Sequence, residues 1–245
     1  MSLSRKELAR YARQMTLPDW GENGQSRLAG ARVFIAGVGG LGCAAATYLA
    51  AAGVGQLALC DADRVEPSNL NRQTLYRDSD VGEEKAPIAA RRIAELNPYV
   101  AATPVVARID DATPDLIAGS DVVLDCLDNL DSRFALNRIA IAARVPLVFA
   151  AVGGLTAYIS FLAPPETPCL ECFLPHIEAP ESPPVPGFLT GMVGSIEAAE
   201  AVKHIVGVGE TLGGRLLVVD EAAPRFDVVT IDRDPACSIC GNLQR

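Results

Sequence analysis

A glycine-rich turn between an apolar strand and a helix constrains this chain most. Arg32–Ala36 is a short apolar run, which predicts a buried strand, and Gly42–Ala52 is rich in alanine, which favours a helix. The run GVGGLG joins them at residues 37–42, and a second predicted strand, Leu57–Cys60, ends at Asp61. Strand, glycine turn, helix and strand form a βαβ unit. This unit predicts parallel pairing of its two strands.

The alternation of helices and strands continues to about residue 150. A helix with Ser4 as its N-cap is predicted at Ser4–Gln14, ahead of the sheet. Beyond the βαβ unit, helices are predicted at Glu83–Leu96, Thr113–Ala118 and Arg133–Ala143, and strands at Val100–Ala107, Val122–Asp125 and Leu147–Ala150. The pattern predicts an α/β fold with a Rossmann-like, doubly wound, mainly parallel sheet and helices on both of its faces.

The character of the sequence changes after residue 150. One predicted helix, Met192–Val206, is surrounded by strand-like segments at Thr156–Phe161, Arg215–Val219 and Phe226–Ile231. These segments predict an antiparallel C-terminal extension of the sheet. We therefore expect a nucleotide-binding region at 1–150 and an extension at 151–245, which together form one continuous domain. Ile177–Pro186 contains four prolines and predicts an irregular loop.

Composition excludes several classes of protein. The 21 Lys and Arg residues against 30 Asp and Glu give a net charge of −9, which argues against a protein that coats nucleic acid. No apolar run approaches the roughly 18 residues of a membrane span. Residues 1–30 lack the apolar core of a secretory signal. We expect a cytoplasmic protein with no nucleic-acid or membrane partner.

The glycine turn and the acid after the second strand together predict a nucleotide site. Glycines allow the backbone to approach a phosphate, and the following helix N-terminus offers free N–H groups. Asp61 stands where an acid hydrogen-bonds ribose hydroxyls. Three cations near these motifs, Arg13, Arg72 and Lys85, suit a triphosphate better than the pyrophosphate of NAD. Taken singly, each cation is more often an ordinary solvated surface charge.

Two CxxC pairs predict a structural metal site. Pairs of thiolates at this spacing each supply two tetrahedral ligands, and two pairs close a zinc site with four cysteine ligands. The alternatives are a redox motif or two unrelated pairs of buried thiols. A redox pair normally opens a helix next to a strand, whereas the second pair lies in the last nine residues of the chain. The four predicted zinc ligands, which belong to the C-terminal extension, are Cys169, Cys172, Cys237 and Cys240.

The order of the motifs resembles the ThiF/MoeB/HesA adenylyltransferases, bacterial relatives of the ubiquitin-activating enzymes, and is most similar to the MoeB branch. The resemblance covers nearly the whole chain. It is carried by RYARQ at 10–14, GVGGLG at 37–42, DAD at 61–63, SNLNRQ at 68–73, GEEK at 82–85, DCLDN at 125–129, both CxxC pairs and GSIEAAEAVK at 194–203.

The resemblance implies that ATP and Mg²⁺ serve to adenylate the C-terminal Gly-Gly carboxylate of a small ubiquitin-like sulfur-carrier protein, for molybdopterin or thiamine type sulfur transfer. It implies catalytic roles for Arg13, Arg72, Lys85 and Asp128, with Asp128 holding Mg²⁺. It implies that Arg13 reaches into the site of a partner, and therefore a homodimer. The nucleotide-binding residues that it implies are Gly37, Gly39, Gly40, Gly42, Asp61, Asp63, Asn69, Arg72, Gln73, Lys85, Asp128 and Asn129.

Three alternatives remain open at this point. The Asp-Asn pair at 128–129 could cap the helix Arg133–Ala143, although Asp131 or Ser132 could do the same. The chain could be a non-catalytic module that binds nucleotide and carrier. It could also be an NAD-dependent oxidoreductase with a structural zinc, although Arg72 and Lys85 would then have no task.

One departure from the family concerns sulfur chemistry. Many relatives carry a cysteine in the loop before the helix at 194–203, whereas residues 178–187 read EAPESPPVPG. Ser182 is a poor substitute, because a hydroxyl without an adjacent base is a weak nucleophile. Cys43 and Cys126, beside the nucleotide motifs, are more typical of small core residues. We therefore expect the reaction to end at the acyl-adenylate, with sulfur supplied by a separate donor.

Overall fold

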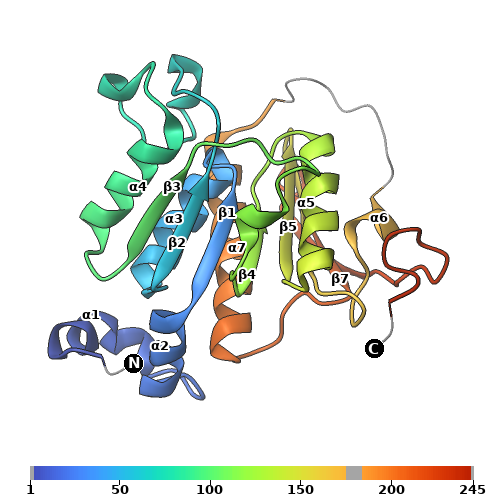
Figure 1. Ribbon diagram of the computed structural model, residues 1–245, viewed down its shortest axis with the longest axis horizontal. Helices are drawn as coiled ribbons and strands as arrows, with labels where there is room; N and C mark the ends of the chain where they lie inside the picture. The colour runs from blue at the N-terminus through green and yellow to red at the C-terminus, as the bar shows by residue number, and fades with distance from the viewer. Residues whose placement is uncertain (1–2, 175–183, 244–245) are drawn as a thin grey trace.

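The computed structural model describes residues 3–174 and 184–243. One part of its sheet consists of parallel strands (Figure 1). β1 pairs with β2 and β4, β2 also pairs with β3, and β4 also pairs with β5, all in parallel. The bounds are β1 (Arg32–Ala36), β2 (Gln56–Cys60), β3 (Ala101–Val105), β4 (Val122–Asp125) and β5 (Leu147–Gly153).

The sheet then continues with antiparallel strands. β6 (Thr156–Leu162), β7 (Arg215–Asp220) and β8 (Arg225–Thr230) follow β5 in that order. The full order is β3-β2-β1-β4-β5-β6-β7-β8, so the predicted α/β class and the antiparallel extension are confirmed. β5 spans residue 150 and pairs on both of its edges, so the sheet has no break there. Pro104 lies in β3, where an edge strand tolerates the missing N–H.

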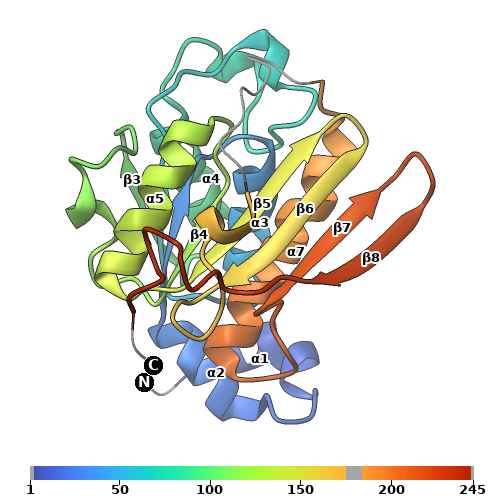
Figure 2. The same cartoon turned by 90° about the vertical axis from the view of Figure 1, so that its right-hand side faces the viewer.

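Helices cover both faces of the sheet. α3 (Gly40–Ala52), α4 (Lys85–Leu96) and α7 (Gly187–Val206) lie on one face, and α5 (Leu130–Ala143) and the short α6 (Leu170–Phe173) lie on the other (Figures 1 and 2). α1 (Arg5–Met15) and α2 (Gly21–Gly30) pack at the amino ends of the parallel strands. None of the described helices has the length and apolarity to cross a membrane.

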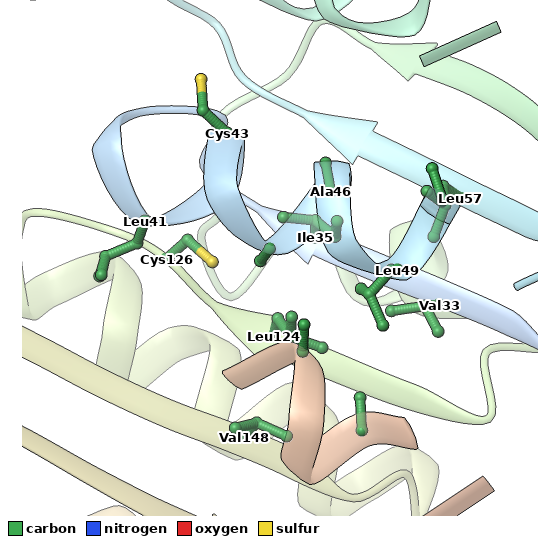
Figure 3. Close-up of a cluster of buried hydrophobic side chains, with 14 of the residues drawn as sticks. Val33, Ile35, Leu41, Cys43, Ala46, Leu49, Leu57, Leu124, Cys126 and Val148 are labelled. Carbon is green, nitrogen blue, oxygen red and sulfur yellow. The ribbon is translucent and has the colours of Figure 1, made fainter. Parts of the chain in front are cut away.

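The alternation of side chains along β1 separates two hydrophobic cores. Val33 and Ile35 point toward α3 and α7, where they meet Leu49 and Leu124 (Figure 3). Phe34 and Ala36 point to the α5 side. These four side chains are fully buried, as the apolar run predicts for a strand covered on both faces.

Several helices differ from the prediction. The predicted helix Thr113–Ala118 is a short 3-10 helix, Pro114–Ile117, and the short α6 was not predicted. α2 lies in a polar, glycine-containing stretch for which no helix was predicted. It is fixed by tertiary bonds, since the Gln25 side-chain oxygen accepts from Gln14 Nε2 at 2.6 Å and from Trp20 Nε1 at 3.3 Å. α7 begins at Gly187 rather than at Met192. The burial of Leu189 and Thr190 outweighs the low helix propensity of the glycines around them.

α5 begins at Leu130 rather than at Arg133, and its cap comes from the Asp-Asn pair at 128–129. The Asn129 side chain accepts a hydrogen bond from Ser132 N at 2.9 Å and is the N-cap. Neither Asp131 nor Ser132 caps the helix, because both lie inside its first turn. At the start of α1, by contrast, the predicted Ser4 cap is present as a capping box with Glu7.

The contact between α3 and α7 depends on a glycine. A Cβ added to Gly194 would lie 2.3 Å from the Leu41 carbonyl oxygen and 3.0 Å from the Ala44 Cβ. The two helices therefore approach backbone to backbone beside the glycine turn. A Cβ added to Gly191, on the same helix, would meet nothing within 4 Å.

We predict that Gly194→Ala lowers the free energy of unfolding by about 1–3 kcal/mol, because the helices must separate to admit the methyl group. Gly191→Ala is the matched control, and it should stabilise the protein by up to ~1 kcal/mol through its higher helix propensity. Chemical denaturation of both variants checks this. Equal stability of the two variants would contradict the close approach.

Candidate functional site

The glycine turn connects β1 to α3 at the carboxyl edge of the parallel strands. Gly37 has φ of +89°, and a Cβ there would lie 2.7 Å from the Cys126 carbonyl oxygen. A Cβ on Gly42 would lie 2.0 Å from the Gly37 carbonyl oxygen. Both positions require glycine, the first for its conformation and both for space. The turn is thus packed tightly against the end of β4, and α3 begins within it, at Gly40.

A cavity of about 380 Å³ opens beside this turn. Its walls come from segments that follow β1, β2, β3 and β4, with Val185 and Thr190 closing one side. Ten of the sequence-predicted nucleotide residues line it: Gly37, Gly39, Gly40, Asp61, Asp63, Arg72, Gln73, Lys85, Asp128 and Asn129. Residues far apart in the sequence therefore meet at the switch point of the sheet, where α/β folds bind ligands.

Three predicted residues do not line the cavity. Gly42 packs under the turn, as described above. Asn69 is buried in a 3-10 turn, Pro67–Asn69, where its side-chain oxygen accepts from Glu66 N at 3.1 Å. Arg13 is exposed on α1, at the opposite end of the sheet from the glycine turn (Figure 1).

Asp61 is fixed by the backbone around the turn. One carboxylate oxygen accepts from Val38 N at 2.8 Å and the other from Asp63 N at 2.9 Å. Burial raises the pKa of Asp61, and the nearby Lys85 ammonium partly offsets this. The carboxylate is thereby oriented at the cavity wall.

The cations of the cavity are held by acidic and carbonyl groups. Lys85 is 6% exposed, and its Nζ lies 3.3 Å from Asp63 Oδ2. Arg108 lies 3.8 Å from the other oxygen of Asp63. Arg72 donates to the Ser68 carbonyl at 2.8 Å and to the Asn71 side chain at 3.1 Å. Cations thus line the cavity beside the carboxylates of Asp61, Asp63 and Asp128, and such cations suit the binding of a polyphosphate.

Gln73 faces this region with an unused acceptor. Its side chain is 4% exposed and lines the cavity. Its Oε1 has no hydrogen-bond partner within the described residues. A buried polar atom without a partner is costly, which is typical of a group that meets a ligand.

Two polar residues with different roles, Asp128 and Asn129, follow β4 in the cavity wall. Asp128 lines the cavity, and its Oδ1 accepts from Asn129 Nδ2 at 3.5 Å. Asn129 caps α5, which leaves the Asp128 carboxylate free of that structural task. A carboxylate next to a phosphate-binding turn is a ligand of the type that Mg²⁺ prefers.

Sequence reasoning missed several cavity residues. Arg108 and Ile109 follow β3, Leu127 follows β4, and Thr190 belongs to the early part of α7. The carboxyl end of each parallel strand was the available signal, because loops at that edge converge. Thr190 gave no such signal, because its helix was expected to begin at Met192.

The four cysteines of the CxxC pairs converge. Their sulfur atoms all lie within 4.8 Å of one another, and the closest pairs are 3.4, 3.7 and 3.8 Å apart. Four thiolates at tetrahedral Zn–S bonds of about 2.3 Å would stand about 3.8 Å apart, so this donor set fits zinc. The cluster ties residues 237 and 240 to the start of α6, beside Ile141 of α5.

The remaining cysteines are buried thiols. Burial raises the pKa of Cys43 to about 12 and that of Cys60 to about 12, and it also raises the pKa of Cys126. Cys60 and Cys126 have raised pKa values even though both line the cavity. Thiols with raised pKa values are poor nucleophiles at neutral pH. The loop residues at 175–183, including Ser182, lie outside the described part of the chain.

Curated relatives match this chain along nearly all of its length. An enzyme named SAMP-activating enzyme E1 from Haloferax volcanii is 42% identical, over 98% of this chain and 92% of its own. The molybdopterin-synthase adenylyltransferase of Escherichia coli is 41% identical, with 98% of each chain covered. The sulfur carrier protein adenylyltransferase of Thermus thermophilus is 40% identical, over 99% of this chain and 94% of its own.

Solved structures and a family model agree with these relatives. The crystal structure of Escherichia coli MccB with ATP has a TM-score of 0.87 and 24% identity, over 95% of this chain and 73% of that one, which is a likeness of fold. The model of the ThiF family matches residues 11–239. This chain therefore belongs to the ThiF family.

Proposed function

We propose that the protein uses ATP to adenylate the C-terminal Gly-Gly carboxylate of a small ubiquitin-like sulfur-carrier protein, releasing pyrophosphate. One observation carries the proposal: ten residues of the family's nucleotide motifs line a single cavity beside the glycine turn. The names of three relatives at 40–42% identity support it, since two are adenylyltransferases and the third is an activating enzyme. The pathway, of the molybdopterin or thiamine type, follows from the carrier that the site accepts.

Catalysis in this proposal comes from position and charge. The glycine turn offers backbone N–H groups to the phosphates, and Asp61 holds the ribose. Arg72 and Lys85 neutralise the triphosphate, so that the carrier carboxylate can approach the α-phosphate. Asp128 would hold Mg²⁺, which supplies charge neutralisation when bound. In the transfer, a bond forms between the carboxylate oxygen and the α-phosphorus, and the bond to the pyrophosphate oxygen breaks.

The displacement of Asp63 is part of this mechanism. Its carboxylate bridges Lys85 at 3.3 Å and Arg108 at 3.8 Å, and it is half exposed. Phosphate oxygens would compete with it for Lys85, because charge-assisted bonds to phosphate are strong. Before nucleotide binds, the ion pair with Asp63 holds Lys85 at the cavity.

The reaction ends at the acyl-adenylate in this proposal. Of the described cysteines, Cys60 and Cys126 line the cavity, and burial raises the pKa of both thiols. The loop at 178–187 contains no cysteine. A separate sulfur donor would therefore attack the adenylate directly and displace AMP.

Carrier-dependent exchange of label between pyrophosphate and ATP tests the proposal. We predict exchange that requires a Gly-Gly-ended carrier and falls at least about a hundredfold in Asp128→Asn, because the charge that holds Mg²⁺ is lost. Asp131→Asn is the matched control, since Asp131 is exposed on α5 and does not line the cavity. Tight ATP binding without exchange for any carrier would instead favour the non-catalytic module.

We further propose that Arg13 acts in the site of a second copy, in a homodimer. Its place on α1, at the far end of the sheet, keeps it out of the cavity of its own chain. An arginine supplied in trans stabilises charge in a phosphoryl-type transition state.

Mixing two inactive variants tests this arrangement. Arg13→Ala and Asp128→Asn should each be inactive alone. After subunit exchange, a mixed dimer has one complete site, so an equimolar mixture should recover about one quarter of wild-type exchange activity. Failure to recover activity, with mixed dimers demonstrated by mass spectrometry, would rule out action in trans.

We propose that the cysteine cluster binds one structural Zn²⁺. Purified protein should contain about one zinc per chain. Cys237→Ser should lose the metal and lower the melting temperature, because the tail is then no longer tied to α6. Cys60→Ala is the control and should retain zinc, since Cys60 lies in β2. Full zinc content in Cys237→Ser, measured by elemental analysis, would contradict this assignment.

A further inference from the structure

One face of α7 lies directly behind the glycine turn. A Cβ on Gly40 would lie 3.0 Å from Thr190, and the Leu41 carbonyl lies against Gly194. Glu197 follows at the next helical spacing, so it projects from the same face. Glu197 is an acid, yet it is fully buried on a helix face that packs closely against α3 at Gly194.

The side chain of Glu197 meets a residue of the cavity wall. Its two carboxyl oxygens lie 3.5 and 3.7 Å from Cys126 Sγ. Cys126 in turn donates its N–H to the Ala36 carbonyl at 2.9 Å, and its own carbonyl lies against Gly37. Cys126 is therefore held between Glu197 and the glycine turn.

Two further charged groups lie in this buried region. Asp125 is fully buried, and its Oδ2 lies 3.1 Å from Arg133 Nη1. Arg133 is 5% exposed, and it also donates to the carbonyls of Ala150 and Leu127. Leu127 N donates to Asp125 Oδ1 at 3.2 Å. Arg133 thus fixes the cavity wall through Leu127 while it pairs with Asp125.

The charges of this cluster do not balance if both acids ionise. Two carboxyl groups face one guanidinium, and that guanidinium is committed to Asp125. Within the described residues, the thiol of Cys126 is the hydrogen-bond partner of Glu197. A buried carboxylate without a cation is strongly unfavourable, whereas a neutral carboxylic acid is tolerated.

We propose that Glu197 is held as a neutral carboxylic acid and is a positioning residue for the nucleotide site, which leaves Arg133 paired with Asp125 and bonded to Leu127. Burial raises the pKa of Glu197, and the Asp125 carboxylate raises it further, in agreement with this geometry. The positioning role rests on the proposed function of the cavity, whereas the protonation state does not.

The protonation state predicts an unusual dependence of stability on pH. A carboxyl group whose pKa is raised by folding takes up a proton when the chain folds. Its contribution to the free energy of unfolding therefore falls as the pH rises above the pKa that the group has in the unfolded chain. Between about pH 5.5 and 8, the folding constant of wild type should fall about tenfold per pH unit relative to Glu197→Gln. The measurement is denaturant unfolding of the zinc-loaded protein.

Glu200 supplies the matched control on the same helix. It is 2% exposed, but its carboxylate is ion-paired with Lys203 and accepts from Leu212 N at 2.6 Å. Glu200→Gln should therefore destabilise the protein. The ratio of its folding constant to that of wild type should not rise tenfold per pH unit. A flat ratio between wild type and Glu197→Gln would show that Glu197 is ionised in the fold, and would overturn the proposal.

Infrared spectroscopy provides a second, independent measurement. At pH 8 the wild type should show the carbonyl band of a protonated carboxylic acid, and Glu197→Gln should lack it. An unchanged spectrum would overturn the assignment even if the variant proved less stable than expected.

ATP binding tests the positioning role. Glu197→Ala should raise the dissociation constant for ATP about tenfold, because the wall at Cys126 and Leu127 is no longer supported. Glu197→Gln should restore it to within about twofold of wild type, since a neutral group of the same shape is retained. Wild-type affinity in Glu197→Ala would refute the role. The pH and infrared measurements need no nucleotide, so their failure is distinguishable from failure of the proposed function.

Discussion

The close approach of three backbone segments around the glycine turn is the constraint on which the rest of the structure depends. Gly37 meets the carbonyl of Cys126, Gly42 meets the carbonyl of Gly37, and Gly194 meets the carbonyl of Leu41. No side chain fits at these contacts, so the turn, the end of β4 and α7 form one packed unit. The cavity lies beside this unit, and Gly37 lines it.

The charges of the site are arranged in two layers with different degrees of burial. In the cavity, Lys85 and Arg108 share the partly exposed Asp63, whose carboxylate gives way to phosphate in our proposal. Deeper in the site, the fully buried Asp125 pairs with Arg133, which lines the cavity but is only 5% exposed. The outer layer can exchange partners when ligand binds, whereas the inner layer keeps the wall in place. This division suits a reaction in which the protein supplies position and charge rather than covalent chemistry.

Much of the fold could be predicted because the sequence alternates regularly. The bounds of β1 and β4 match the predicted strands, since their apolar runs are short and end at a glycine or an acid. α2 could not be predicted, because its stability comes from bonds of Gln25 to other segments rather than from local propensity. The start of α7 was missed for a similar reason, since burial of Leu189 and Thr190 outweighs the glycines near it.

The residues of the candidate site could also be predicted only in part. The family motifs gave ten residues of the cavity, whereas Arg108 and Thr190 belong to no motif and reach it only through the topology of the sheet. The buried Glu197 stands within a family motif, but nothing in its spacing indicates that Cys126 is its partner.

The most direct test of the central claim is the intact mass of the carrier after incubation with the enzyme, ATP and Mg²⁺. We expect a Gly-Gly-ended carrier to gain the mass of one adenylyl group and to lose it on addition of a sulfur nucleophile. A carrier whose mass is unchanged, despite ATP bound in the cavity, would contradict adenylation. A carrier joined covalently to the enzyme itself would contradict an end point at the acyl-adenylate.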